Sequence, residues 1–122
     1  MADVTLKRFD ELENDHNQFL YAGRSIGVTS WGMNIIKMPP NWQDYPEHDH
    51  VDDGQEEVYI VLEGEGILYA DTQSWPIKPG MLIRVGPQQK RKITPGDNGM
   101  TLLALGGTPG QAYTAPAWAG KS

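Results

Sequence analysis

The chain of 122 residues contains no cysteine and no apolar segment long enough to cross a membrane. The lack of cysteine excludes disulfide bonds and thiol nucleophiles, so cysteine usage gives no information about the redox compartment. Polar and charged residues begin at Asp3, and the sequence therefore predicts neither a signal peptide nor a transmembrane helix, and no membrane partner. The default expectation for such a sequence is a cytoplasmic protein.

The sequence also lacks the motifs of several enzyme classes. It has no nucleophile and base triad, no glycine-rich phosphate loop and no dinucleotide fingerprint. Basic residues are few, because ten lysines and arginines against sixteen aspartates and glutamates give a net charge of -6. Proteins that bind phosphate backbones normally carry a basic excess, so we expect no nucleic-acid partner and interpret Lys90, Arg91 and Lys92 as a solvated strand end.

The charges that are present are separated along the chain. Nine acidic residues lie between Asp44 and Glu65, and no lysine or arginine occurs from Met38 to Ile77. Five basic residues then follow in a stretch without acids, from Thr72 to Gly96. The two blocks could face each other in the folded protein.

Short apolar segments separated by turn residues predict an all-β fold. The length of the chain favours a single domain, residues 1–122, with a core of its own. An antiparallel sandwich or barrel is expected from the even spacing of six β-rich segments, at residues 31–38, 57–62, 66–70, 81–85, 90–93 and 100–105. The first segment is the one helical candidate, because Leu6, Phe9 and Leu12 recur at three-residue spacing and predict one or two turns lying on the barrel.

Two histidines and a glutamate form the most informative group of the sequence. His48 and His50 are two residues apart and would point to the same face of a β-strand, and Glu57 opens the next predicted strand. Imidazole and carboxylate ligands suit zinc, iron, nickel, copper or manganese, and three ligands leave positions open for water or a substrate. The third histidine, His16, lies in a polar stretch and is expected to be a solvated loop residue.

This stretch resembles the first motif of the cupin superfamily, Gly-x5-His-x-His-x(3 or 4)-Glu-x6-Gly. The four matching residues are His48, His50, Glu57 and Gly64. Two departures stand out: six residues separate His50 from Glu57, and Trp42 occupies the place of the first glycine. The extra length contains Asp52-Asp53-Gly54, so a longer turn is expected to absorb it.

Residues 77–87 are similar to the second cupin motif, in which a Pro-Gly turn leads into a strand, a second turn and a metal-binding histidine. Here no histidine follows, and the corresponding position falls on Arg91, or on Lys90 if the turn differs by one residue. The resemblance implies a small single-domain cupin of the cupin 2 type, a double-stranded β-helix (jelly-roll) barrel with motif one at about 42–64 and motif two at about 77–93. It also implies a homodimer that binds a small molecule.

Two functions follow from the position of Arg91. If its side chain points away, His48, His50 and Glu57 form a degenerate metal site for a dioxygenase or isomerase acting on a small molecule. If it points inward, it would repel a divalent cation and pair with Glu57 in a bidentate bridge. The protein would then be a metal-free or non-catalytic module that binds a small anionic ligand through Arg91 and the histidines, with Tyr59 giving the pocket a polar tip. The residues do not identify the substrate or decide whether the chain is an enzyme.

The strand that begins at Glu57 is apolar on both faces. An inward Glu57 places Tyr59 and Val61 on the inner face and leaves an outer face formed by Val58, Ile60 and Leu62. Such a face needs cover from another sheet, the N-terminal segment or a second subunit. We expect a homodimer through this face, with residues 113–118 covering further apolar surface.

Overall fold

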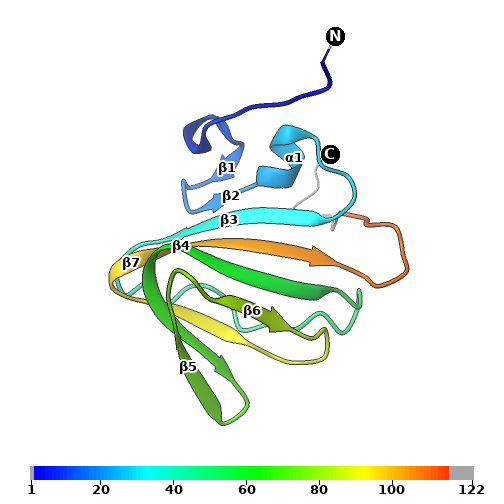
Figure 1. Cartoon of the computed structure of the whole chain (residues 1–122). Coiled ribbons are helices and arrows are strands. Elements are labelled where there is room, and N and C mark those ends of the chain that lie inside the picture. Colours follow the sequence, from blue (N-terminus) through cyan, green and yellow to red (C-terminus); the bar gives the residue numbers. More distant parts are fainter. Residues whose placement is uncertain (1, 116–122) are drawn as a thin grey trace.

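The computed structural model describes residues 2–115 of the chain, and its arrangement is shown in Figure 1. Within these residues the chain forms seven strands, one short α-helix and one 3-10 turn. Their order is η1 (Phe9–Glu11), β1 (Asn14–Asp15), β2 (Phe19–Leu20), α1 (Ala22–Ile26), β3 (Gly32–Met38), β4 (Glu56–Ala70), β5 (Gln73–Ile77), β6 (Leu82–Val85) and β7 (Lys92–Gly107). No helix in this part of the chain is long and apolar enough to span a membrane.

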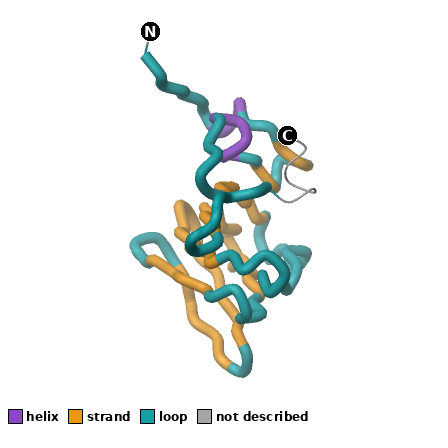
Figure 2. Tube along the Cα trace, turned by 90° about the vertical axis from the view of Figure 1, so that its right-hand side faces the viewer, coloured by secondary structure: helices purple, strands orange, loops and turns teal. Residues whose placement is uncertain are grey.

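All strand pairs are antiparallel and belong to one strongly bent sheet. The strand order is β1-β2-β3-β7-β4-β5, and β6 pairs with β4. The first half of β4 pairs with β6 and its second half with β5, whereas β7 follows β4 along almost its whole length. The all-β class and the jelly-roll barrel predicted from the sequence are confirmed, with the strands and their connecting loops wrapped around a common interior (Figure 2).

Two pairs of predicted strands are each one continuous strand in the structure. Residues 57–62 and 66–70 are both part of β4, because the glycines between them lie at irregularities of the β4–β7 pairing and do not end the strand. Residues 90–93 and 100–105 merge in the same way into β7. β5 was not among the predicted strands; it contains Trp75 and Pro76 and pairs with β4 at an edge of the sheet, where proline is tolerated.

The core lies on the concave face of the sheet. Glu57, Tyr59 and Val61 point inward as predicted, and Tyr59 and Val61 are fully buried. Burying a large apolar side chain contributes about 1.5–3 kcal/mol, so this cluster supplies much of the stability. Its buried members are Ile36, Met38, Tyr45, Tyr59, Val61, Leu68, Ile77, Val85, Ile93, Met100, Leu102 and Ala104.

A second, smaller cluster attaches the N-terminal segment to the outer face of β3. It joins Leu12, Leu20, Ala22 and Ile35, and Figure 1 shows β1 and β2 continuing the sheet beside β3, with α1 next to them. The predicted helical candidate is a single 3-10 turn, and Leu6 before it is exposed. The prediction that no other helix exists is wrong, because α1 forms at residues 22–26. Its five residues are too few to show a 3.6-residue repeat.

The N-terminal segment leaves part of the outer face open. Val58 and Ile60 are half-buried, and Leu62 is 37% exposed. Leu82 on β6 lies directly opposite Ile60 and is 81% exposed. An apolar surface therefore remains on β4 and β6, and we call these four residues the outer patch.

β4 and β7 approach each other closely at two glycines. Gly64 has a φ of 74° and Gly99 a φ of 75°. A Cβ built on Gly64 would overlap with the carbonyl oxygen of Gly99. The last glycine of the motif is therefore required by backbone packing at the bend of β4.

We predict that Gly64→Ala destabilises the protein much more than Gly80→Ala does. Both glycines have a positive φ, but a Cβ at Gly80 meets no atom within 4 Å, so that control measures backbone strain alone, about 1 kcal/mol. The steric overlap at Gly64 should add about 2 kcal/mol or more. Urea unfolding followed by circular dichroism measures both changes, and equal losses would show that the close approach is not required.

Candidate metal centre

The two histidines are positioned by backbone hydrogen bonds to the start of β7 and the loop before it. The His48 N–H donates to the carbonyl of Arg91 at 3.0 Å, and the Arg91 N–H donates back to His48 at 2.9 Å. The His50 N–H donates to the carbonyl of Pro87 at 2.8 Å. This isolated β-bridge replaces the strand expected from the sequence and still places both imidazoles on one side of the chain.

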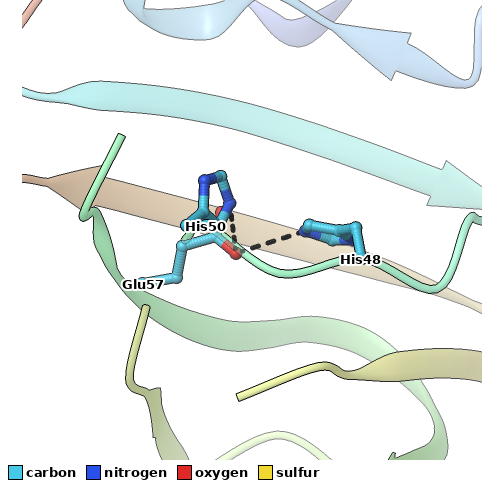
Figure 3. A group of neighbouring side chains, drawn as sticks. All are labelled: His48, His50 and Glu57. Carbon is cyan, nitrogen blue, oxygen red and sulfur yellow. Dashed lines mark ion pairs between the residues drawn. The ribbon is translucent and has the colours of Figure 1, made fainter. Parts of the chain in front are cut away.

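The imidazoles converge on the carboxylate of Glu57 (Figure 3). His50 Nε2 lies 3.2 Å and His48 Nε2 lies 3.6 Å from Glu57 Oε1. The three candidate ligand atoms are all within 4.8 Å of one another. The side chains are 12–27% exposed, so the group is partly shielded from water and still reachable.

Second contacts fix the orientation of each ring. His48 Nδ1 lies 3.0 Å from the carbonyl oxygen of Pro46, and His50 Nδ1 lies 3.1 Å from a carboxylate oxygen of Asp53. Both partners are acceptors here, which favours a proton on Nδ1, so Nε2 of each ring, which faces Glu57, is the atom that would bind a metal. The Asp52-Asp53-Gly54 turn thus does more than absorb extra length, because Asp53 orients a candidate ligand.

Glu57 is held as a carboxylate by the groups around it. Burial alone would raise its pKa, but hydrogen bonding with His48, His50 and Tyr59 outweighs burial and holds the pKa far below its usual range. The Tyr59 hydroxyl donates to Oε1 at 2.5 Å. Hydrogen bonding to Glu57 raises the pKa of His50, against an opposing effect of burial. Burial and the nearby Glu57 charge also raise the pKa of Tyr45, which keeps it protonated.

Arg91 points inward and is completely buried. Its Nη2 donates to the carbonyl of Gly86 at 3.0 Å, and its Nη1 lies 3.5 Å from Glu57 Oε1. The bidentate bridge considered from the sequence is not present, since one arm of the guanidinium is used for Gly86 and Nη1 makes no hydrogen bond. Lys90, the other candidate for this position, is exposed.

The donor set fits a divalent metal ion. Two neutral imidazole nitrogens and one carboxylate are a common ligand combination, and the buried His50 Nε2 has no well-directed hydrogen bond despite its ion-pair distance to Glu57. Arg91 adds a permanent positive charge next to the carboxylate ligand. The residues therefore fit a three-ligand site whose affinity is reduced by a neighbouring cation.

The ligand group opens into a cavity of about 560 Å³. Tyr59 and Arg91, predicted to contact a ligand, do not line it, because they are buried behind Glu57; their direct contact with a ligand stays a prediction. His16 is exposed and lies outside this cavity, as expected. The lining includes side chains that the sequence analysis did not place there, namely Asp15, Phe19, Tyr21, Asn34, Ile36, Trp42, Tyr45, Asp49, Asp52, Asp53, Gln55, Ala104 and Tyr113.

Comparisons with known proteins agree with this architecture. The family model of the cupin domain matches residues 34–106. A search of functionally curated proteins found no match. The crystal structure of a cupin protein from Bacteroides fragilis has a TM-score of 0.69 and 19% identity, and the alignment covers 92% of this chain and 94% of that one.

Two further crystal structures carry names that specify an activity. A sugar phosphate isomerase of the cupin superfamily from Silicibacter pomeroyi has a TM-score of 0.65 and 23% identity over 79% of this chain, which spans only 59% of that protein. A predicted oxalate decarboxylase from Thermotoga maritima has a TM-score of 0.65 and 22% identity over 84% of this chain and 96% of that one. At these identities the similarity establishes a shared fold.

We predict that Arg91→His strengthens metal binding. The change removes a buried cation beside Glu57 and offers a fourth ligand, a third imidazole, at the position of the second motif, so affinity should rise about tenfold. Lys90→His is the matched control, because Lys90 is adjacent and exposed and should leave affinity unchanged. Competition with a chelator measures the affinities, and melting curves in excess chelator check folding. Tighter binding by the Lys90 variant alone would contradict this alignment of the second motif.

Proposed function

Because the chain belongs to the cupin domain family, we propose that it is a metal-dependent enzyme that acts on a small molecule by dioxygenation or isomerisation. His48, His50 and Glu57 are the metal ligands in this proposal. The observation that carries it is their convergence at the wall of a cavity large enough for a small molecule. Zinc, nickel, iron, manganese and copper all suit the ligand set.

The surrounding residues have distinct tasks in this proposal. A bound ion would act as a Lewis acid with open positions for a substrate oxygen or water. Asp53 and the Pro46 carbonyl hold the two imidazoles in place. Tyr59 donates to Glu57 and keeps its carboxylate from rotating. The aromatic and aliphatic side chains of the cavity wall exclude water from part of the substrate surface.

We predict that the double variant His48→Ala/His50→Ala loses metal. Protein purified without an affinity tag should contain near-stoichiometric metal by elemental analysis, and the double variant should contain only background. His16→Ala is the control, because His16 is an exposed histidine outside the cavity and should not change metal content. Unchanged uptake by the double variant would contradict the ligand assignment.

A metal-free module that binds a small anionic ligand is the second candidate. It is supported by the buried Arg91, which already supplies a positive charge to Glu57 in the absence of an ion. A chain with no metal after purification and no uptake from added zinc, nickel, iron, manganese or copper would favour this candidate. A cytoplasmic location and the absence of nucleic-acid partners also stay predictions.

We also propose that the chain forms a homodimer through the outer patch, Val58, Ile60, Leu62 and Leu82. The patch is apolar and lies beyond the cover that the N-terminal segment gives to β3. Of the tail that was expected to cover apolar surface, Tyr113 packs beside Gly32, where a Cβ would come within 3.1 Å of its ring. Residues 116–118 lie outside the described part of the chain.

We predict that Leu82→Glu converts this dimer to a monomer. Leu82 is 81% exposed, so the substitution should leave the fold of the subunit intact while placing a charge in the apolar interface. Light scattering should give about twice 13.6 kDa for the unaltered chain and 13.6 kDa for the variant. Leu6→Glu, at a leucine that is 88% exposed and away from the patch, should remain dimeric. A monomeric mass for the unaltered chain would remove the interface.

A further inference from the structure

The cavity beside the candidate ligands is lined by acidic residues, and among the described residues of its wall only His48 and His50 can carry a positive charge. Four aspartates line it in addition to Glu57, and no lysine or arginine does. The buried guanidinium of Arg91 is outside the lining and already close to Glu57. The aspartates are Asp15, Asp49, Asp52 and Asp53.

Asp49 and Asp52 carry negative charge that the described residues do not neutralise. Asp53 faces His50 at 3.1 Å and Asp15 faces His16 at 3.3 Å. No ion pair of Asp49 or Asp52 is found among the described side chains, and Asp49 accepts only the backbone N–H of Val51. The cavity therefore presents a negative potential to an entering molecule.

The same wall contains five aromatic side chains. They are contributed by β2 and the residue that follows it, by the loop before His48 and by the chain after β7. One of these rings already contacts a cation, because the guanidinium carbon of Arg24, a residue outside the lining, lies 4.8 Å from the centroid of Tyr21. Aromatic faces combined with carboxylates are the surroundings that stabilise an organic cation after it leaves water. The five residues are Phe19, Tyr21, Trp42, Tyr45 and Tyr113.

We propose that this cavity takes a small organic cation, an amine or quaternary ammonium group attached to an apolar body, in preference to a neutral or anionic molecule. The inference rests on the proposed function in that the cavity is taken as the substrate site. Sugar phosphates and oxalate, the compounds that appear in the names of two structural neighbours, are both anions. Repulsion by Asp49, Asp52 and Glu57 would reject such anions even where they fit by size.

Three probes of the same size and different charge test the proposal. Benzylamine, benzyl alcohol and benzoate are titrated at neutral pH and low salt into isotopically labelled protein, once after chelator treatment and once after loading with zinc. In both forms benzylamine should bind about fivefold or more tighter than benzyl alcohol. In the chelator-treated form benzoate should bind weakest. The shifted NMR signals should include the Trp42 indole and the amides of Asn34 and Gln55, which line the cavity.

The variant Asp49→Asn/Asp52→Asn tests the source of the preference. Asparagine keeps the shape and the acceptor used by the Val51 N–H, so benzyl alcohol should bind as before while benzylamine loses about fivefold in affinity. Glu65→Gln/Asp97→Asn is the matched control, because it removes two exposed charges outside the cavity and should change neither.

Three results would overturn the proposal: equal or tighter binding of benzoate to the chelator-treated protein, equal affinity for the amine and the alcohol, or no binding at the cavity by any probe. Each of these three binding results can be obtained whether or not the protein takes up metal. A chain that fails to bind metal but prefers benzylamine contradicts the proposed enzyme and leaves the cation site standing. A chain that binds metal and prefers benzoate after chelation contradicts the cation site and leaves the proposed enzyme standing.

Discussion

The carboxylate of Glu57 is the group on which the arrangement of the site depends. It is 12% exposed and sits on the inner face of β4, where an ionised side chain without partners would be strongly destabilising. Its partners come from three parts of the chain: the histidine loop, β4 itself through Tyr59, and Arg91 immediately before β7. One buried charge thus ties together segments that would otherwise be connected only by the sheet.

This constraint also accounts for the backbone contacts around the site. The β-bridge between His48 and Arg91 fixes the distance from the histidine loop to β7, and β7 in turn pairs with β4 in a register that places Glu57 opposite Gly106. Gly106 leaves room there, since a Cβ would come within 2.6 Å of the Gln55 side chain. The positions of both histidines relative to the carboxylate are therefore set by main-chain hydrogen bonds, and neither imidazole needs a strand of its own.

The sequence was sufficient to predict the parts of the site that depend on local spacing. A two-residue separation puts His48 and His50 on one side in a strand or in a bridged loop, so the pair was correct although the predicted strand was not. The inward face of β4 followed from simple alternation. Positions determined by distant contacts were not predictable. Phe19 and Tyr21 reach the cavity because β2 pairs with β3, and their sequence neighbourhood carries no signal of that pairing.

Arg91 shows the same limit in a different way. The second-motif resemblance predicts Arg91 at the ligand position and leaves its direction open, because direction depends on which acceptors remain available inside the barrel. The carbonyl of Gly86 accepts a hydrogen bond from one arm of the guanidinium and Glu57 lies near the other.

The buried end of the site, at Arg91, thus contains a fixed positive charge, while the cavity wall is acidic. A divalent ion entering here is attracted by the wall and repelled by Arg91, so the electrostatics favour ready entry over tight retention. A cationic ligand is likewise attracted by the acidic wall and repelled by Arg91. These two effects orient its charged group toward Asp49 and Asp52 and its apolar body toward the aromatic side chains.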